Sequence, residues 1–132
     1  MTVVLVLDQG ALELAKTLKQ TLQGARIHGL AHRVEGTDET FTDTAPHLRK
    51  LFQSGEAIIG ICATGILVRA LAPVLVDKQN EPPVIAMAAD SSVVVPLLGL
   101  FAAALLLGDR VVISSYVVDY SLPLDTSLRW LH

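Results

Sequence analysis

The chain has 132 residues, of which 52% are hydrophobic and 17% charged, and its formal net charge is -3. This length suits one domain with a buried core, and the apolar content argues against general disorder. Because the charges are mixed and form no long run of one sign, the composition favours no nucleic-acid partner. We therefore expect a single domain over residues 1–132.

The cysteine count and the N-terminus indicate a cytoplasmic protein. Cys62 is the one cysteine, so an intramolecular disulfide is excluded, and we expect this residue to be buried packing. Residues 1–10 lack the basic region of a signal peptide and predict a first strand. The most apolar stretch, 93–107, is shorter than the ~18 residues that cross a bilayer, so we expect no membrane segment. Its apolar character is compatible with a homo-oligomer.

Taken in chain order, the hydrophobic periodicity alternates between strands and helices. The first helix follows the first strand directly, and the polar segment 33–44 is expected to be a surface connection. A second helix begins after a cap at Asp43 or Thr44 and ends before Gly55. We expect strands at 3–7, 27–31, 57–63, 84–87, 93–95 and 111–115, helices at 11–22, 45–54, 66–76 and 102–107, and an irregular tail. The alternation predicts an α/β fold, a three-layer sandwich with a mostly parallel sheet flanked by helices.

The turn at Thr64-Gly65 is the first candidate binding site. It follows the strand AIIGICA, which is apolar on both faces as a central parallel strand would be, and it leads directly into a helix. In such sheets the ligand crevice lies beyond the carboxyl ends of the strands, where helix N–H groups attract anions. Thr64 can add a hydroxyl donor. The alternative is that Thr64 only caps the helix and Gly65 only relieves crowding.

Arg69 and Asp8 complete the set of candidate binding residues. Arg69 lies four residues beyond Gly65, about one helical turn, so we expect it to point toward the same crevice. Its planar guanidinium suits a carboxylate, and the alternative is a solvated or ion-paired arginine. Asp8 ends the first strand, where ligand contacts are common, although an aspartate there can equally cap the next helix.

The remaining motifs exclude several classes of site. The four histidines show no metal-ligand spacing, and His28 and His32 on one strand would lie too far apart to share an ion, so each is expected to be structural or at the surface. The chain has no Gly-x-Gly-x-x-Gly, no Walker-type Gly-Lys-Ser/Thr and no Gly-x-Ser-x-Gly. We therefore expect no metal, no cofactor, and neither nucleotide binding nor serine hydrolysis of these standard kinds.

Residues 58–98 carry a longer combined pattern. It consists of an apolar strand, then Gly-Ile-x-Val-Arg-x-x-Ala-Pro, Asp-Lys, a loop, a Pro-Val strand and a final apolar strand. The positions that match are Gly65, Ile66, Val68, Arg69, Ala72, Pro73, Asp77, Lys78, Pro83 and Val84. This pattern resembles the amino-terminal domain of the CbiG family, whose members act in cobalamin (corrin-ring) biosynthesis.

The resemblance implies hydrolytic opening of the cobalt-precorrin-5A lactone with release of acetaldehyde. The partner would be a carboxylate-rich tetrapyrrole, for which Arg69 and the helix start at Thr64-Gly65 are suitable contacts. Similar domains are fused to a precorrin-3B methyltransferase, which implies such a domain as a second partner. Relatives continue with a Gly-Gly-His-x-Gly-Ala-Asn type turn, whereas this chain reads Leu-Gly-Leu-Phe-Ala-Ala-Ala over residues 98–104. The alternative is a non-catalytic tetrapyrrole-binding or scaffolding domain.

Overall fold

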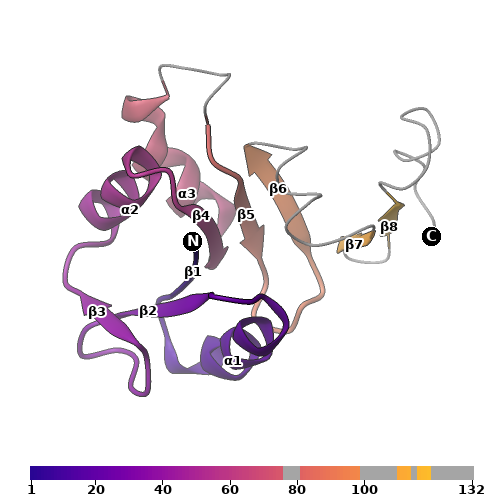
Figure 1. The fold of residues 1–132 in the computed structure, drawn as a ribbon, viewed down its shortest axis with the longest axis horizontal. Helices are drawn as coiled ribbons and strands as arrows, with labels where there is room; N and C mark the ends of the chain where they lie inside the picture. The colour runs from indigo at the N-terminus through magenta and orange to yellow at the C-terminus, as the bar shows by residue number, and fades with distance from the viewer. Residues whose placement is uncertain (76–80, 99–109, 114–115, 120–132) are drawn as a thin grey trace.

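A six-stranded sheet forms the centre of the computed structural model, which describes residues 1–75, 81–98, 110–113 and 116–119 (Figure 1). Its strand order is β3-β2-β1-β4-β5-β6. The strands are β1 (Thr2–Val6), β2 (Arg26–Leu30), β3 (Glu39–Phe41), β4 (Ala57–Ile61), β5 (Val84–Met87) and β6 (Val94–Leu98). Neighbours from β3 to β5 pair in parallel, and β6 runs antiparallel to β5. The predicted mostly parallel sheet is confirmed.

Within the described residues, three α-helices cover the two faces of this sheet. They are α1 (Leu12–Thr21), α2 (Thr44–Gln53) and α3 (Thr64–Leu71). Figure 1 shows α1 on one side of the sheet and α2 with α3 on the other. This arrangement confirms the predicted three-layer sandwich. Among the helices that the structure describes, none is long and apolar enough to cross a bilayer.

Strand β1 shows why the sheet lies between two layers. Val4 and Val6 pack with residues of α1, whereas Val3 and Leu5 pack with α2 and α3. All four side chains are at most 1% exposed. Burying one aliphatic side chain of this kind contributes about 1.5 to 3 kcal/mol, so both faces of β1 stabilise the fold. The unbroken aliphatic run in the sequence reflects this two-sided burial.

The expectation that residues 33–44 form only a surface connection was wrong, because β3 lies within them. Asp38 holds the start of this short strand. Its carboxylate accepts a hydrogen bond from the Ile27 amide at 2.8 Å and one from Lys19 Nζ at 2.7 Å. These two donors, the backbone amide first, lower the pKa of Asp38. The hydrogen bonds of Asp38 to α1 and β2, which we call the Asp38 anchor, thus stabilise β3, a strand that hydrophobic periodicity does not indicate.

Two further boundaries differ from the sequence prediction. The helix expected at 66–76 begins at Thr64 and ends at Leu71, and the chain continues as a 3₁₀ turn, Ala72–Val74. Pro73 explains the stop, since it lacks the amide that a longer helix would need.

The C-terminal region is the second difference. The expected last strand is β7 (Arg110–Ile113), and it pairs antiparallel with β8 (Tyr116–Asp119), where an irregular tail was expected. The helix predicted at 102–107 and the pair Asp77-Lys78 lie outside the described residues.

Candidate functional site

The order of the strands places a switch point between β1 and β4. From β1 the chain proceeds to β2 and β3 on one side, then crosses back to β4 and continues to β5 on the other. Loops that leave two neighbouring parallel strands in opposite directions open a crevice at their carboxyl ends. Val6 pairs with Ile61, so the loops that carry Asp8 and Thr64 leave the sheet at the same level. The structure therefore brings these two predicted residues to one edge.

Asp8 occupies the N-cap position of a 3₁₀ turn, but neither its side chain nor that of Thr64 makes a capping hydrogen bond. Asp8 precedes the 3₁₀ turn Gln9–Ala11 in an extended conformation, but its side chain makes no capping hydrogen bond to that turn. Ala63 occupies the N-cap position of α3, Thr64 is the first helical residue, and no side chain caps this end. Both polar side chains are exposed. The capping alternatives considered for them are therefore not realised.

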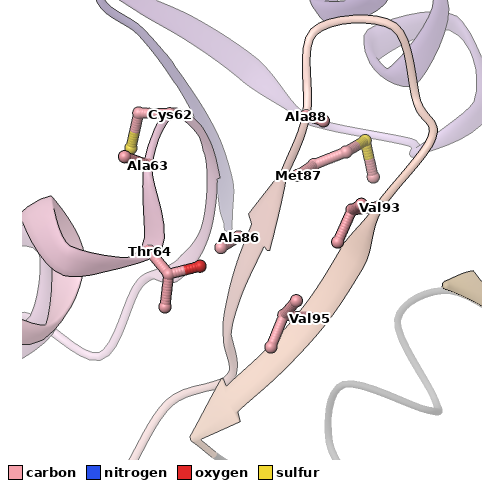
Figure 2. Close-up of a pocket in the computed structure, with 8 residues that line it drawn as sticks. All are labelled: Cys62, Ala63, Thr64, Ala86, Met87, Ala88, Val93 and Val95. Atoms are coloured by element: carbon pink, nitrogen blue, oxygen red, sulfur yellow. The ribbon is translucent and has the colours of Figure 1, made fainter. Parts of the chain in front are cut away.

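A cavity of about 210 Å³ opens beside Thr64, at the carboxyl ends of β4 and β5 (Figure 2). It lies between the start of α3 and the antiparallel pair of β5 and β6. Figure 2 shows the hydroxyl oxygen of Thr64 directed toward Ala86 on β5. The lining residues are Cys62, Ala63, Thr64, Ala86, Met87, Ala88, Val93 and Val95. The wall is thus apolar apart from one hydroxyl and one thiol.

The chemistry of the wall favours binding over acid–base catalysis. Burial raises the pKa of the Cys62 thiol to about 11, so the thiol stays protonated at neutral pH and is a poor nucleophile. The sequence predicted that Cys62 is buried packing; in the structure it is half-buried, and its side chain packs against the core and also lines the cavity. None of the described lining residues carries a carboxylate, an imidazole or an amine. The cavity therefore suits an apolar group with one hydrogen-bonding atom.

Gly65 and Arg69 lie outside this cavity. Helix α3 buries Leu67, Ala70 and Leu71 against the sheet, whereas Gly65 and Arg69 are exposed on the outer face. Helical side chains lean toward the N-terminus, so Arg69 covers the turn that contains Gly65. A Cβ added at Gly65 would meet nothing within 4 Å, which shows that the space above it is open. The two residues form an open surface at the start of α3.

The sequence did not indicate that the loop after β2 is hydrogen-bonded to the loop that carries Asp8. The side-chain amide of Gln9 accepts a hydrogen bond from the Glu35 amide at 2.9 Å and donates one to the Glu35 carbonyl at 3.4 Å. This pair of contacts, which we call the Gln9 clamp, ties the loop that carries Asp8 to the loop after β2. His32 lies in that second loop, exposed and with a φ of 68°, not on a strand beside His28 as expected.

The sequence also missed a contact between His28 and His47, whose ring nitrogens lie 2.9 Å apart. These residues are far apart in the chain, so no local spacing could have indicated it. Within the part of the chain that the structure describes, no group of three or more His, Cys, Asp or Glu residues could hold a metal ion.

Comparison with known families decides the relationship. Residues 46–112 match the family model described as Cobalamin synthesis G N-terminal, a segment that spans half of the chain. The chain belongs to this family. The matched segment contains α2 from its third residue on, all of α3 and every residue that lines the cavity, whereas β1 to β3 precede it. Membership in the Cobalamin synthesis G N-terminal family therefore rests on the half of the sheet that builds the candidate site.

A solved structure shows the same fold. It is described as a cobalamin biosynthesis protein G homolog from Sulfolobus solfataricus, and it aligns with 80% of this chain at a TM-score of 0.58 and 14% sequence identity. The chain spans 32% of that protein. A comparison with curated proteins finds no match.

Proposed function

We propose that this domain acts in cobalamin biosynthesis by binding the carboxylate-rich tetrapyrrole cobalt-precorrin-5A at the carboxyl edge of β1 and β4. The observation that carries this proposal is the cavity beside Thr64. It lies at the carboxyl ends of β4 and β5, and Thr64 in its wall follows β4 at the switch point, the position where an α/β sheet binds its ligand. All of its lining residues fall in the segment that matches the family model.

The size of the cavity limits how a tetrapyrrole would bind. A volume of about 210 Å³ is below the roughly 300 to 1,000 Å³ that encloses a drug-sized ligand, so the cavity receives one short substituent of the macrocycle. The apolar stem of that substituent would lie in the cavity, and its carboxylate would remain at the exposed start of α3, where it would bind the hydroxyl of Thr64 and the first amides of the helix, which lack intrahelical acceptors. The ring would extend over Gly65, where space is open, and Arg69 would pair with a second carboxylate.

Absorbance titration with cobalt-precorrin-5A tests this function. We expect a spectral change on binding, and at least about tenfold weaker binding for Thr64→Val, since a hydrogen bond to a charged group contributes about 1.5 to 3 kcal/mol. Thr64→Ser keeps the hydroxyl and serves as the matched control with unchanged affinity. Arg69→Ala should weaken binding and reduce its dependence on salt. The absence of any spectral change with the parent protein, or equal affinity for Thr64→Val, would contradict the proposal.

Asp8 favours a second candidate, the opening of the lactone by this domain. Its carboxylate lies at the switch point, is exposed and makes no capping hydrogen bond. A carboxylate in that place can act as a general base that takes a proton from water as the water attacks the lactone carbonyl. The alternative remains a domain that binds the tetrapyrrole without turnover and presents it to a precorrin methyltransferase domain.

An acetaldehyde assay on the same samples separates these candidates. If the domain is catalytic, the parent protein releases acetaldehyde, and Asp8→Asn lowers the rate by about a hundredfold or more, the usual contribution of a general base, while the affinity is kept. Release at the buffer rate by a parent protein that binds the tetrapyrrole would exclude catalysis by this domain alone.

A further inference from the structure

Three elements meet through a chain of polar side chains at the β3 end of the sheet. Nε2 of His28, on β2, lies 2.8 Å from a carboxylate oxygen of Glu39 on β3. Nδ1 of the same ring lies 2.9 Å from Nε2 of His47, in the first turn of α2. The His28 side chain is only 6% exposed, whereas Glu39 is 54% exposed. A buried ring therefore connects a surface carboxylate to a second ring.

The partners of each atom fix where the protons lie. The Glu39 carboxylate only accepts hydrogen bonds, so Nε2 of His28 carries a proton and donates it. When His28 is neutral, its Nδ1 is therefore an acceptor, and Nε2 of His47 donates to it. Both rings are neutral in this arrangement, and every contact in the chain is satisfied.

The geometry of the two rings favours a shared proton over a shared metal. Their centroids are 5.1 Å apart, close to the largest separation that two such rings can have when their nitrogens lie 2.9 Å apart. The two nitrogens therefore point at each other and do not converge on a third point, as ligands of one ion must. The Phe41 ring is stacked on His47 at a centroid distance of 4.6 Å and an interplanar angle of 6°, which fixes its orientation.

We propose that the Glu39–His28–His47 chain is a proton-sensitive latch that holds β3 and the first turn of α2 against β2. The closed latch has room for one proton between the two rings. A second proton on this contact would place two N–H groups face to face, so its uptake breaks the contact between the two rings and frees the first turn of α2, whose His47 also stacks on Phe41 of β3. The contact between His28 and Glu39 becomes an ion pair and is kept. The latch is independent of the proposed tetrapyrrole site, because none of its residues lines the cavity.

The groups around His28 and His47 determine how the stability of the closed latch depends on pH. Burial is the main cause that lowers the pKa of both histidines below 6.5. At His28 the carboxylates of Glu39, Asp38 and Glu56 raise the pKa, and Arg26 lowers it further. At His47 the neighbouring His28 and Lys50 lower the pKa further, and Glu39 raises it. The start of α2 also disfavours a cation at His47. A histidine with a lowered pKa stabilises the closed state above pH 6.5, and this stability is lost as the pH falls through 6.5 toward the lowered value.

Hydrogen exchange measured peptide by peptide tests the latch. After correction for the intrinsic exchange rate, we expect the protection of residues 39–47 to fall more than about tenfold per pH unit below 6.5, because opening takes up more than one proton. Protection of α1 should change less. His47→Gln can still donate to His28 but cannot take a proton, so its slope should not exceed about tenfold per unit. His32→Asn, which removes an exposed histidine at a positive φ that asparagine tolerates, should keep the parent slope.

Imidazole titration followed by NMR gives a readout that needs no variant. We expect His28 and His47 to titrate together and below 6.5. The latch is contradicted if the two rings titrate independently, if either titrates above 6.5, or if residues 39–47 respond to acid no more steeply than α1. Below pH 3.8 the Asp38 anchor adds a separate effect, because the stability linked to the lowered pKa of Asp38 is lost as the pH falls from 3.8 toward that lowered value.

Discussion

Val95→Phe is expected to abolish most tetrapyrrole binding without unfolding the domain. Val95 lies on β6, is half-buried, and lines the cavity opposite the start of α3 (Figure 2). A phenyl ring at this position occupies space that the ligand substituent needs, and a half-buried site at the mouth of a cavity can accept it with little strain. We expect the dissociation constant for cobalt-precorrin-5A to rise at least about tenfold, as measured by absorbance titration.

Leu97→Phe is the matched control for this variant. Leu97 lies two residues further along β6, on the same face of the strand, and is half-buried against the same core cluster, but it does not line the cavity. Its affinity should equal that of the parent protein. Equal loss of binding in both variants would mean that β6 as a whole, and not the cavity, determines affinity.

Leu67→Ala is expected to be the most destabilising single substitution considered for this domain. Leu67 is fully buried on the inner face of α3, where it packs directly on the backbone of Gly60 in β4. A Cβ at Gly60 would lie 2.9 Å from both terminal methyl groups of Leu67. Gly60 has no side chain that could move into the space left by the leucine. We therefore expect the free energy of unfolding to fall by about 2 to 5 kcal/mol in chemical denaturation.

Val68→Ala provides the comparison on the same helix. Val68 is 51% exposed, so its truncation removes little buried surface and should change the free energy of unfolding by no more than about 0.5 kcal/mol. A similar loss in both variants would show that the effect comes from the helix as a whole. A loss below about 1 kcal/mol for Leu67→Ala would show that the core closes around the gap.

The layers of the fold could be predicted from the sequence because they depend on local periodicity. The aliphatic runs of β1 and β4 are buried on both faces, and their composition alone indicates a central parallel sheet. Strand β3 could not be predicted in this way. Its residues Glu39 and Thr40 are exposed, and the strand depends on the Asp38 anchor, which forms only once α1 and β2 are packed.

The candidate site was predictable only in part, for the same reason. The switch-point rule brings Asp8 and Thr64 together from strand order, and helical spacing places Arg69 one turn beyond Gly65. The face that Arg69 occupies is decided by which residues of α3 meet the sheet, and the cavity requires the antiparallel register of β5 and β6. The contact between His28 and His47 likewise exists only in three dimensions.

The Gln9 clamp joins two loops that follow different strands, the loop after β1 and the loop after β2. The loop after β2 continues directly into β3, so a displacement of β3 would also move Glu35. Because Glu35 is hydrogen-bonded to Gln9, the same displacement would move the backbone next to Asp8. Residues at the outer edge of the sheet are therefore mechanically connected to the crevice at its centre. A change in the length of the loop after β2 would therefore alter the position of the Asp8 carboxylate at the switch point.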